Sequence, residues 1–344
     1  RDRDKDVTDF CPVQHPADDP NSDIITTHFE YHSMESNILK LDMLGHDDPT
    51  MVRMMEDLTG VNARQIPLDD PDTMSIFVSS KVLGFENDEL LGPTGAVAIP
   101  EFNTRFTRGM LMDTLPKDFN TLVRLSGFSH GTDVWLGNAR ELIVSGTASV
   151  LETVGCRDDI MLYLISMGLD PKMSFKIMEK VRKGKVKKGG FDEGWVEAMR
   201  DHDVPEWYID SLAKIGYLFP KAHAVAYVMM AFRIAWFKVH RPLAFYAAYF
   251  SIRAKAFDQE FMCQGMDVCQ KKMREIIAKD KDASAVEQDM LTTLEVCYEF
   301  YLRGFHFDTI SIYDSDATAF KITENGLLPP FISVRGLGES AALD

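Results

Sequence analysis

The sequence predicts a mainly α-helical fold with a small α+β part. Apolar residues recur at helical spacing through most of the chain, as in Met51, Met55 and Leu58 ahead of Gly60. Residues with a preference for β-structure are confined to short runs near the N-terminus and around 305–322. With 344 residues, the chain can bury a large core in two or three domains.

The expected elements follow this pattern in order. Short strands are predicted at 24–31 and 37–45, and the first long helix begins at Thr50. Glycine-rich breaks at 92–95 and 126–133 predict loops, and the Gly/Lys-rich stretch 184–190 predicts a mobile link. Further helices are predicted at 72–82, 158–167, 171–183, 205–215, 222–240, 264–278 and 285–302.

The start of the helix predicted at 222–240 carries a lysine and a histidine, and this makes it the most informative feature for function. Pro220 and Pro242 mark its two ends, and the apolar run between them predicts a core helix, because it is shorter than the roughly twenty residues that a bilayer requires. Lys221 and His223 lie where free backbone N–H groups and a partial positive charge favour an anion. A phosphate site is one interpretation; a snorkelling lysine and a structural histidine are the other.

Composition limits the possible functions. A formal net charge of −16 argues against a protein that coats nucleic acid, although residues 172–188 form a basic run that is either a solvated face or a DNA contact. Five cysteines without a C-x-x-C pair indicate neither a disulfide framework nor a structural zinc site. Without a signal peptide, the expected location is the cytoplasm. The start at Arg1 predicts a piece of a longer protein.

Several residues outside that helix are candidates for chemistry. Asp42 stands inside an apolar run, where a carboxylate requires a partner such as Mg²⁺, unless it lies on the exposed face of an edge strand. Arg105 is suited to phosphate oxygens, and Arg157 precedes an apolar helix at a possible anion site. Gly336 and Gly338 could form the hairpin of a helix-hairpin-helix element.

Several ordered motifs together resemble one family. They are Leu-Lys-Leu-Asp-Met-Leu-Gly-His-Asp-Asp-Pro-Thr at 39–50, Ile-Pro-Glu-Phe at 99–102, the segments 129–139 and 155–161, and Phe-Pro-Lys-Ala-His-Ala-Val-Ala-Tyr at 219–227. The sequence resembles the bacterial C-family replicative DNA polymerases, specifically the α subunit of PolC-type DNA polymerase III. The resemblance covers nearly the whole chain.

The resemblance implies DNA-directed DNA synthesis, in which two Mg²⁺ ions assist transfer of a deoxynucleotide from dNTP to a primer 3′-hydroxyl. Asp42 matches the third aspartate of the palm in that family, and no strand carrying the other two is found, so the chain alone should be inactive. The implied organisation is the end of a palm at 1–60, helical fingers at 61–260, and the start of a duplex-binding region with a truncated helix-hairpin-helix at 261–344.

The resemblance also implies roles for individual residues. The expected partners are primer-template DNA, dNTP and replisome subunits such as the sliding clamp, the last through parts absent from this chain, and no membrane. The nucleotide-binding candidates are Arg105, Ser126, His130, Arg157, Phe219, Lys221, His223 and Tyr227. The DNA-binding candidates are Lys180, Arg182, Lys183, Lys185, Arg335, Gly336 and Gly338.

Two other functions are weighed against this one. A non-catalytic helical module that binds nucleic acid on the same scaffold is the alternative, and the sequence that precedes Arg1 would separate the two. A phosphotransferase acting on free nucleotides is disfavoured, because no G-x-x-x-x-G-K-[ST] motif is present.

Overall fold

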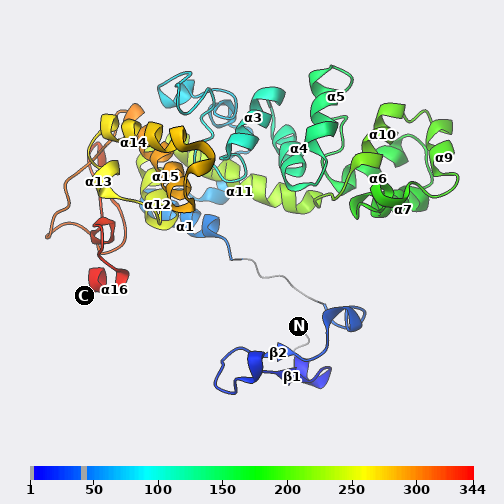
Figure 1. Ribbon diagram of the computed structural model, residues 1–344, viewed down its shortest axis with the longest axis horizontal. Helices are drawn as coiled ribbons and strands as arrows, with labels where there is room; N and C mark the ends of the chain where they lie inside the picture. Colours follow the sequence, from blue (N-terminus) through cyan, green and yellow to red (C-terminus); the bar gives the residue numbers. More distant parts are fainter. Residues whose placement is uncertain (1–3, 40–44) are drawn as a thin grey trace. The chain divides into compact units, whose positions relative to one another are not determined.

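A computed structural model describes residues 4–39 and 45–344 of the chain (Figure 1). It divides the chain into two compact units, the first ending at His46 and the second running from Asp47 to Asp344. The sequence reasoning placed its first boundary at residue 60 instead. Helix α1 (Asp47–Thr59) contacts α11 and α12 and therefore lies in the second unit, while the assignment of the segments to palm and fingers stays a prediction.

The first unit contains little regular structure. Strands β1 (Val13–Gln14) and β2 (Thr26–Thr27) pair antiparallel, and the predicted strand at 24–31 is therefore only two residues long. Three short 3-10 helices cover Val7–Asp9, Pro16–Asp18 and Tyr31–Ser33. The predicted strand at 37–45 falls largely outside the described residues, and with it Asp42.

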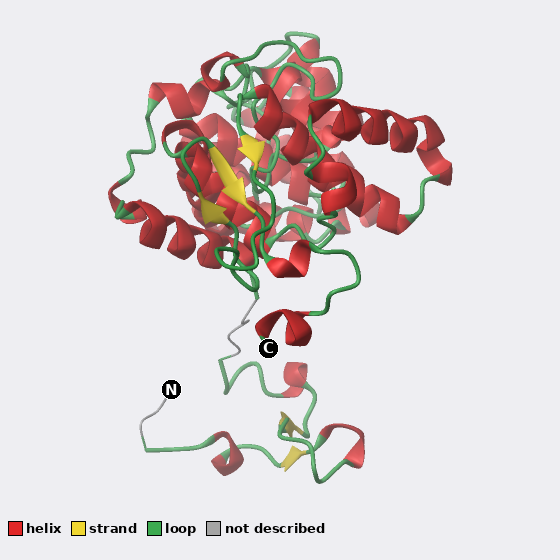
Figure 2. Ribbon diagram, turned by 90° about the vertical axis from the view of Figure 1, so that its left-hand side faces the viewer, coloured by secondary structure: helices red, strands yellow, loops and turns green. Residues whose placement is uncertain are grey.

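The second unit is mainly helical, with loops between the helices and few strands (Figure 2), which confirms the predicted mainly helical fold. Its helices after α1 are α2 (Pro71–Ser75), α3 (Arg105–Thr114), α4 (Phe119–His130), α5 (Arg140–Val144), α6 (Arg157–Ser166), α7 (Pro171–Arg182), α8 (Lys185–Gly189), α9 (Trp195–Asp201), α10 (Glu206–Lys214), α11 (Lys221–His240), α12 (Pro242–Ile252), α13 (Gln259–Met262), α14 (Met266–Lys279), α15 (Ala285–Leu302) and α16 (Glu339–Leu343).

A small mixed sheet follows α15, in the β-leaning region that the sequence predicts. Strand β5 (Gly326–Leu328) lies in the centre, parallel to β3 (His306–Phe307) and antiparallel to β4 (Lys321–Ile322). The three residues of β5 are buried, and both β4 and β5 contact α12. The sheet is therefore an addition to a helical core.

Helix α11 is the central element of the second unit. It contacts α1, α2, α4, α6 and α12, and Figure 1 shows it running from the side of α4 and α6 towards α12 and α15. With 20 residues it is the one described helix long and apolar enough to cross a membrane by length and composition. Its many helix contacts, and the complete burial of Phe232, Phe237 and Lys238, are those of a core helix.

Three local predictions were wrong. The predicted loop at 126–133 is largely the last part of α4, which Asp118 caps by accepting a hydrogen bond from the Thr121 backbone N–H. The link at 184–190 is mostly the short helix α8, and the helix expected at 72–82 covers only Pro71–Ser75. Glycine and serine content alone could not distinguish a loop from a packed helix.

Candidate nucleotide-binding site

The start of α11 is held by two neighbouring chain segments. The extended stretch before it pairs with Thr132, just after α4, through Tyr217, and with Cys156, just before α6, through Phe219. The Arg157 backbone N–H also donates to the Phe219 carbonyl at 3.2 Å. Residues from α4, α6 and α11 are thereby brought together, which sequence spacing alone could not indicate.

Aromatic rings line this junction. The rings of His130 and Phe219 stack with centroids 4.6 Å apart and planes at 22°, and Tyr227 stacks on Phe219 at 6.5 Å. His223 meets the Phe219 ring edge-on at 5.8 Å and is itself exposed. We call His130, Phe219, Lys221, His223 and Tyr227 the α11 site. Two rings next to an exposed imidazole can hold a planar group.

Glu101 holds His130 in this stack, and sequence reasoning did not single it out. One oxygen of its carboxylate, Oε2, lies 2.6 Å from His130 Nε2 and accepts a hydrogen bond from Ser126 Oγ at 3.1 Å. The hydrogen bond to Glu101 raises the pKa of His130, against the opposing effect of burial. Ser126 is fully buried, so its hydroxyl serves this contact and not the surface. The only sequence signal for Glu101 was its place in the Ile-Pro-Glu-Phe motif.

Carboxylates from α6 occupy the positive end of α11. The Lys221 backbone N–H donates to Asp158 Oδ2 at 2.9 Å, and Lys221 Nζ lies 3.4 Å from Asp159 Oδ1. Asp159 also pairs with Arg124 at 2.6 Å, and Arg157 Nε lies 3.8 Å from Asp158. The anion that the helix start favours is thus partly supplied by the chain itself. Arg124 and both aspartates complete the site, and none was a candidate.

Lys221 lines two hollows, and two others lie near Glu101 and Arg105. Of the last two, one, of about 490 Å³, is lined by Glu101 and His130 together with Asn103, Thr104, Tyr249 and Arg253. The other contains Arg105 at the start of α3 with the buried Arg108 and Glu295, and it shares Asn103 and Thr104 with the first. The structure therefore brings seven of the eight nucleotide-binding candidates together, and places Arg105 in the neighbouring hollow.

The DNA-binding candidates differ in how they are paired. Lys180 Nζ lies 2.7 Å from Asp192, while Arg182 and Lys183 both bond to Glu179 at 2.9 and 3.0 Å, and these hydrogen bonds lower the pKa of Glu179 to about 2. Arg335 lies 3.1 Å from Glu260, and Gly336 has a φ of +85° that favours glycine. Gly338 precedes α16 as its N-cap residue. Lys185 is exposed on α8.

Known proteins resemble the chain over nearly its whole length. Residues 48–203 match the family model described as the bacterial DNA polymerase III alpha subunit finger domain. The DNA polymerase III PolC-type of Caldanaerobacter subterraneus subsp. tengcongensis is 55% identical over 340 residues, which is 99% of this chain and 24% of the relative. The proteins of the same name from Streptococcus suis and Halalkalibacterium halodurans are 54% and 52% identical, over 98% of this chain and 23% of each relative. The chain thus spans about a quarter of the length of these relatives.

Proposed function

Since this chain belongs to the family of PolC-type DNA polymerase III α subunits, we propose that it supplies the fingers of a replicative DNA-directed DNA polymerase. The proposed reaction transfers a deoxynucleotide from dNTP to a primer 3′-hydroxyl under the direction of a template. The observation that carries the proposal is the α11 site, where a ring stack lies next to three basic side chains, His130 from α4 and Lys221 and His223 from α11.

The α11 site has the groups that a nucleotide requires. Phe219 and Tyr227 would form a wall for the base or sugar, and His130, Lys221 and His223 would contact the triphosphate. His223 is exposed and has no carboxylate partner among residues 4–39 and 45–344, so its imidazole is available to an anion. Lys221 has a side chain 38% exposed and only a 3.4 Å contact to Asp159, which a phosphate could replace. Ser126 and Arg157 would act indirectly, because Ser126 donates a hydrogen bond to Glu101 and Arg157 lies next to Asp158.

Mg²⁺ is the proposed cofactor, with Asp42 as its ligand in this chain. When bound, two such ions would lower the pKa of the primer hydroxyl and stabilise the transition state. Asp42 lies outside the described residues, and within the described ranges no cluster of three His, Cys, Asp or Glu side chains suits a metal ion. The residues of the α11 site therefore do not suit Mg²⁺, and we derive no catalytic step through the metal ion.

The proposal extends to DNA and to the rest of the polymerase. Lys180, Arg182, Lys183 and Lys185 would contact template or primer phosphates, and Arg335, Gly336 and Gly338 would begin a helix-hairpin-helix that holds the duplex. Other replisome subunits, such as the sliding clamp, would bind parts of the polymerase outside this chain. The alternative is a helical module that binds nucleic acid without catalysis.

Nucleotide binding by the chain tests the α11 site. We expect a fluorescent dNTP analogue to bind, and Lys221→Met or His223→Ala to weaken it about tenfold, the size of one charge-assisted contact. Lys255→Met is the matched control, because Lys255 is exposed and has no ion-pair partner in the described part of the chain. Equal affinity of the wild type and the first two variants would remove these side chains from the site.

Primer extension separates an enzyme from a binding module. In the polymerase that contains this chain, Asp42→Asn should abolish extension and leave primer-template affinity within about twofold, because the carboxylate would act on the metal and not on the DNA. A parent protein that binds primer-template but extends no primer as wild type would support the non-catalytic alternative. Normal extension by Asp42→Asn would contradict the role of this aspartate.

A further inference from the structure

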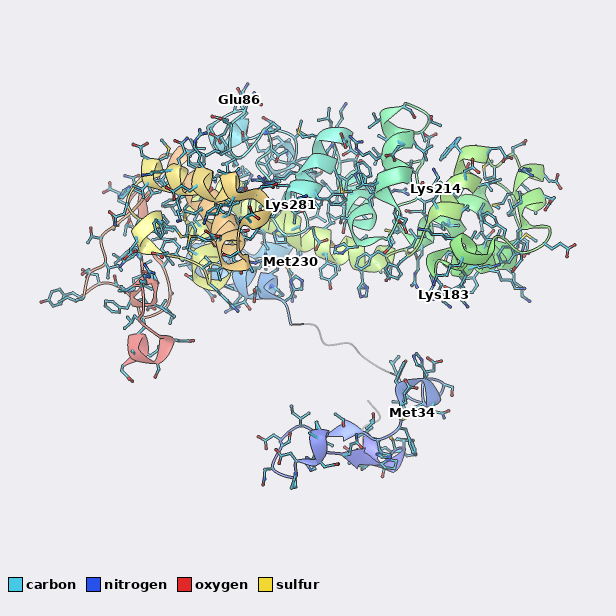
Figure 3. The ribbon with its side chains drawn as sticks, viewed as in Figure 1. Met34, Glu86, Lys183, Lys214, Met230 and Lys281 are labelled. Atoms are coloured by element: carbon cyan, nitrogen blue, oxygen red, sulfur yellow. The ribbon has the colours of Figure 1, made fainter. Side chains whose placement is uncertain are left out.

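One face of α7 is exposed and carries an aromatic ring between lysines. Its buried face consists of Ser174, Ile177, Met178 and Val181. The opposite face carries Lys172, Phe175, Lys176 and Lys183, which we call the α7 stripe. Phe175 is 49% exposed, although burial of a phenylalanine side chain would be favourable. Figure 3 labels Lys183 at the end of this helix.

A second exposed ring lies beside the end of α7. Tyr217 is 42% exposed, yet its backbone is fixed, because its carbonyl accepts from the Thr132 N–H at 3.0 Å. The turn after α7 packs directly on this segment: a Cβ at Gly184 would lie 2.3 Å from the Gly216 carbonyl oxygen. The Leu218 N–H also donates to the Arg182 carbonyl at 3.2 Å. The end of the stripe is therefore packed against the segment that carries Tyr217, and the two adjoin as one surface.

The free positive charges on this surface belong to particular lysines. Lys180, Arg182, Lys183 and Lys187 each have an acidic partner within the chain. Lys172, Lys176 and Lys185 are exposed and have no such partner in the part of the chain that the structure describes. On an otherwise acidic chain, these three ammonium groups remain available to an anionic ligand.

We propose that the α7 stripe together with Tyr217 and Lys185 binds single-stranded nucleic acid, with Phe175 and Tyr217 stacking on bases and the three free lysines contacting phosphates. Exposed rings can stack only on bases that are not already stacked in a duplex, whereas the lysines suit any phosphate backbone. Phe175 and Lys183, the C-cap residue of α7, are eight residues apart, or about 12 Å along the helix axis, which is the length of about three stacked nucleotides. The proposal rests on the proposed polymerase function, for which this strand would be the unpaired template.

Binding of a labelled deoxythymidine oligonucleotide of about 12 nucleotides to the 344-residue chain tests the proposal. Fluorescence anisotropy should show binding that the double variant Phe175→Ala/Tyr217→Ala weakens at least tenfold, because stacking contributes strongly at each base. The double variant Lys172→Gln/Lys176→Gln should also make the negative slope of log affinity against log salt shallower by about 1.4, or about 0.7 for each lost phosphate contact.

Matched controls use exposed residues away from this surface. Tyr313→Ala, at a ring 90% exposed, and Lys255→Gln/Lys271→Gln should leave the affinity unchanged. The proposal is overturned if the wild-type chain does not bind the oligonucleotide, if a blunt duplex of equal length binds as tightly, or if the two aromatic substitutions change nothing. Lys221→Met should leave this binding intact, so a failure here is distinct from a failure of the α11 nucleotide site.

Discussion

Helix α11 has a lysine near each end, and the two lysines have opposite environments. Lys221 begins the helix, with a side chain 38% exposed and a 3.4 Å contact to Asp159. Lys238 is fully buried, and its Nζ donates to the carbonyls of Gly95 and Val97 and to Glu299 at 2.8, 2.6 and 2.9 Å. Burial lowers the pKa of Lys238 to about 8 even though Glu299 opposes the shift.

The difference shows how one helix is divided between two roles. All three ammonium hydrogens of Lys238 are used by the chain, and Tyr246 donates to the same Glu299 at 2.7 Å, so this end fastens α11 to α12 and α15. The side-chain contact of Lys221 to Asp159 is longer and more solvated, so a ligand can replace it at small cost. The buried end therefore provides stability, and the exposed end is the one suited to binding.

The largest effect should come from Lys238→Met. The substitution leaves the Glu299 carboxylate buried without its cation, and we expect the free energy of unfolding to fall by about 3–5 kcal/mol. Urea unfolding followed by circular dichroism measures this change. Lys238→Met/Glu299→Leu should recover most of the loss, because it removes the uncompensated charge. A loss below about 1 kcal/mol in the single variant would mean that the buried pair does not fasten this end.

Gly127→Ala should have the next largest effect, at the exposed end of α11. A Cβ at this position would lie 2.5 Å from the Gly155 carbonyl oxygen and 2.7 Å from Cys156 Sγ, so α4 and α6 must separate. We expect a loss of about 1–3 kcal/mol. Gly109→Ala is the matched control, because Gly109 lies in α3 with nothing within 4 Å of its Cβ, and alanine should stabilise that helix. Equal melting temperatures for the two variants would contradict this account.

Lys221→Met should change stability by about 1 kcal/mol or less, because the ion pair that it removes is partly exposed. The backbone N–H of residue 221 would still donate to Asp158. The same urea experiment, run beside Lys238→Met, measures the contrast between the two ends directly. If the two substitutions destabilise the chain equally, the division of α11 into a structural and a binding end is wrong.

The smallest effect should be the pH dependence of the stability that the Glu101–His130 pair provides. Folding raises the pKa of His130, because its imidazole bonds to Glu101. The stabilisation that this pair provides is therefore complete below the ordinary histidine pKa of about 6.5, and it is lost as pH rises through the higher pKa of the folded state. The difference in melting temperature between the wild type and Glu101→Gln should therefore be largest near pH 6 and shrink towards about pH 9. A difference that stays constant over this range would show that His130 does not titrate through the pair.

Local sequence pattern predicted much of the fold. The helix predicted at 285–302 has those bounds in the structure, and the helix predicted at 222–240 begins one residue earlier. In both, apolar spacing and residues such as Ser284 at the N-cap act over only a few positions. Gly127 shows where this reasoning stops, because a glycine that predicts a loop instead permits close contact between α4 and the residues before α6.

The sequence was sufficient to predict that the start of α11 favours an anion, because a helix N-terminus with Lys221 and His223 has this property wherever it lies. Tertiary structure decided what faces that charge. Asp159 is 62 residues from Lys221 along the chain, and Glu299 is 61 residues from Lys238. Each pairing depends on how the helices pack, since burial and distance determine whether a lysine stabilises the fold or remains available to a ligand.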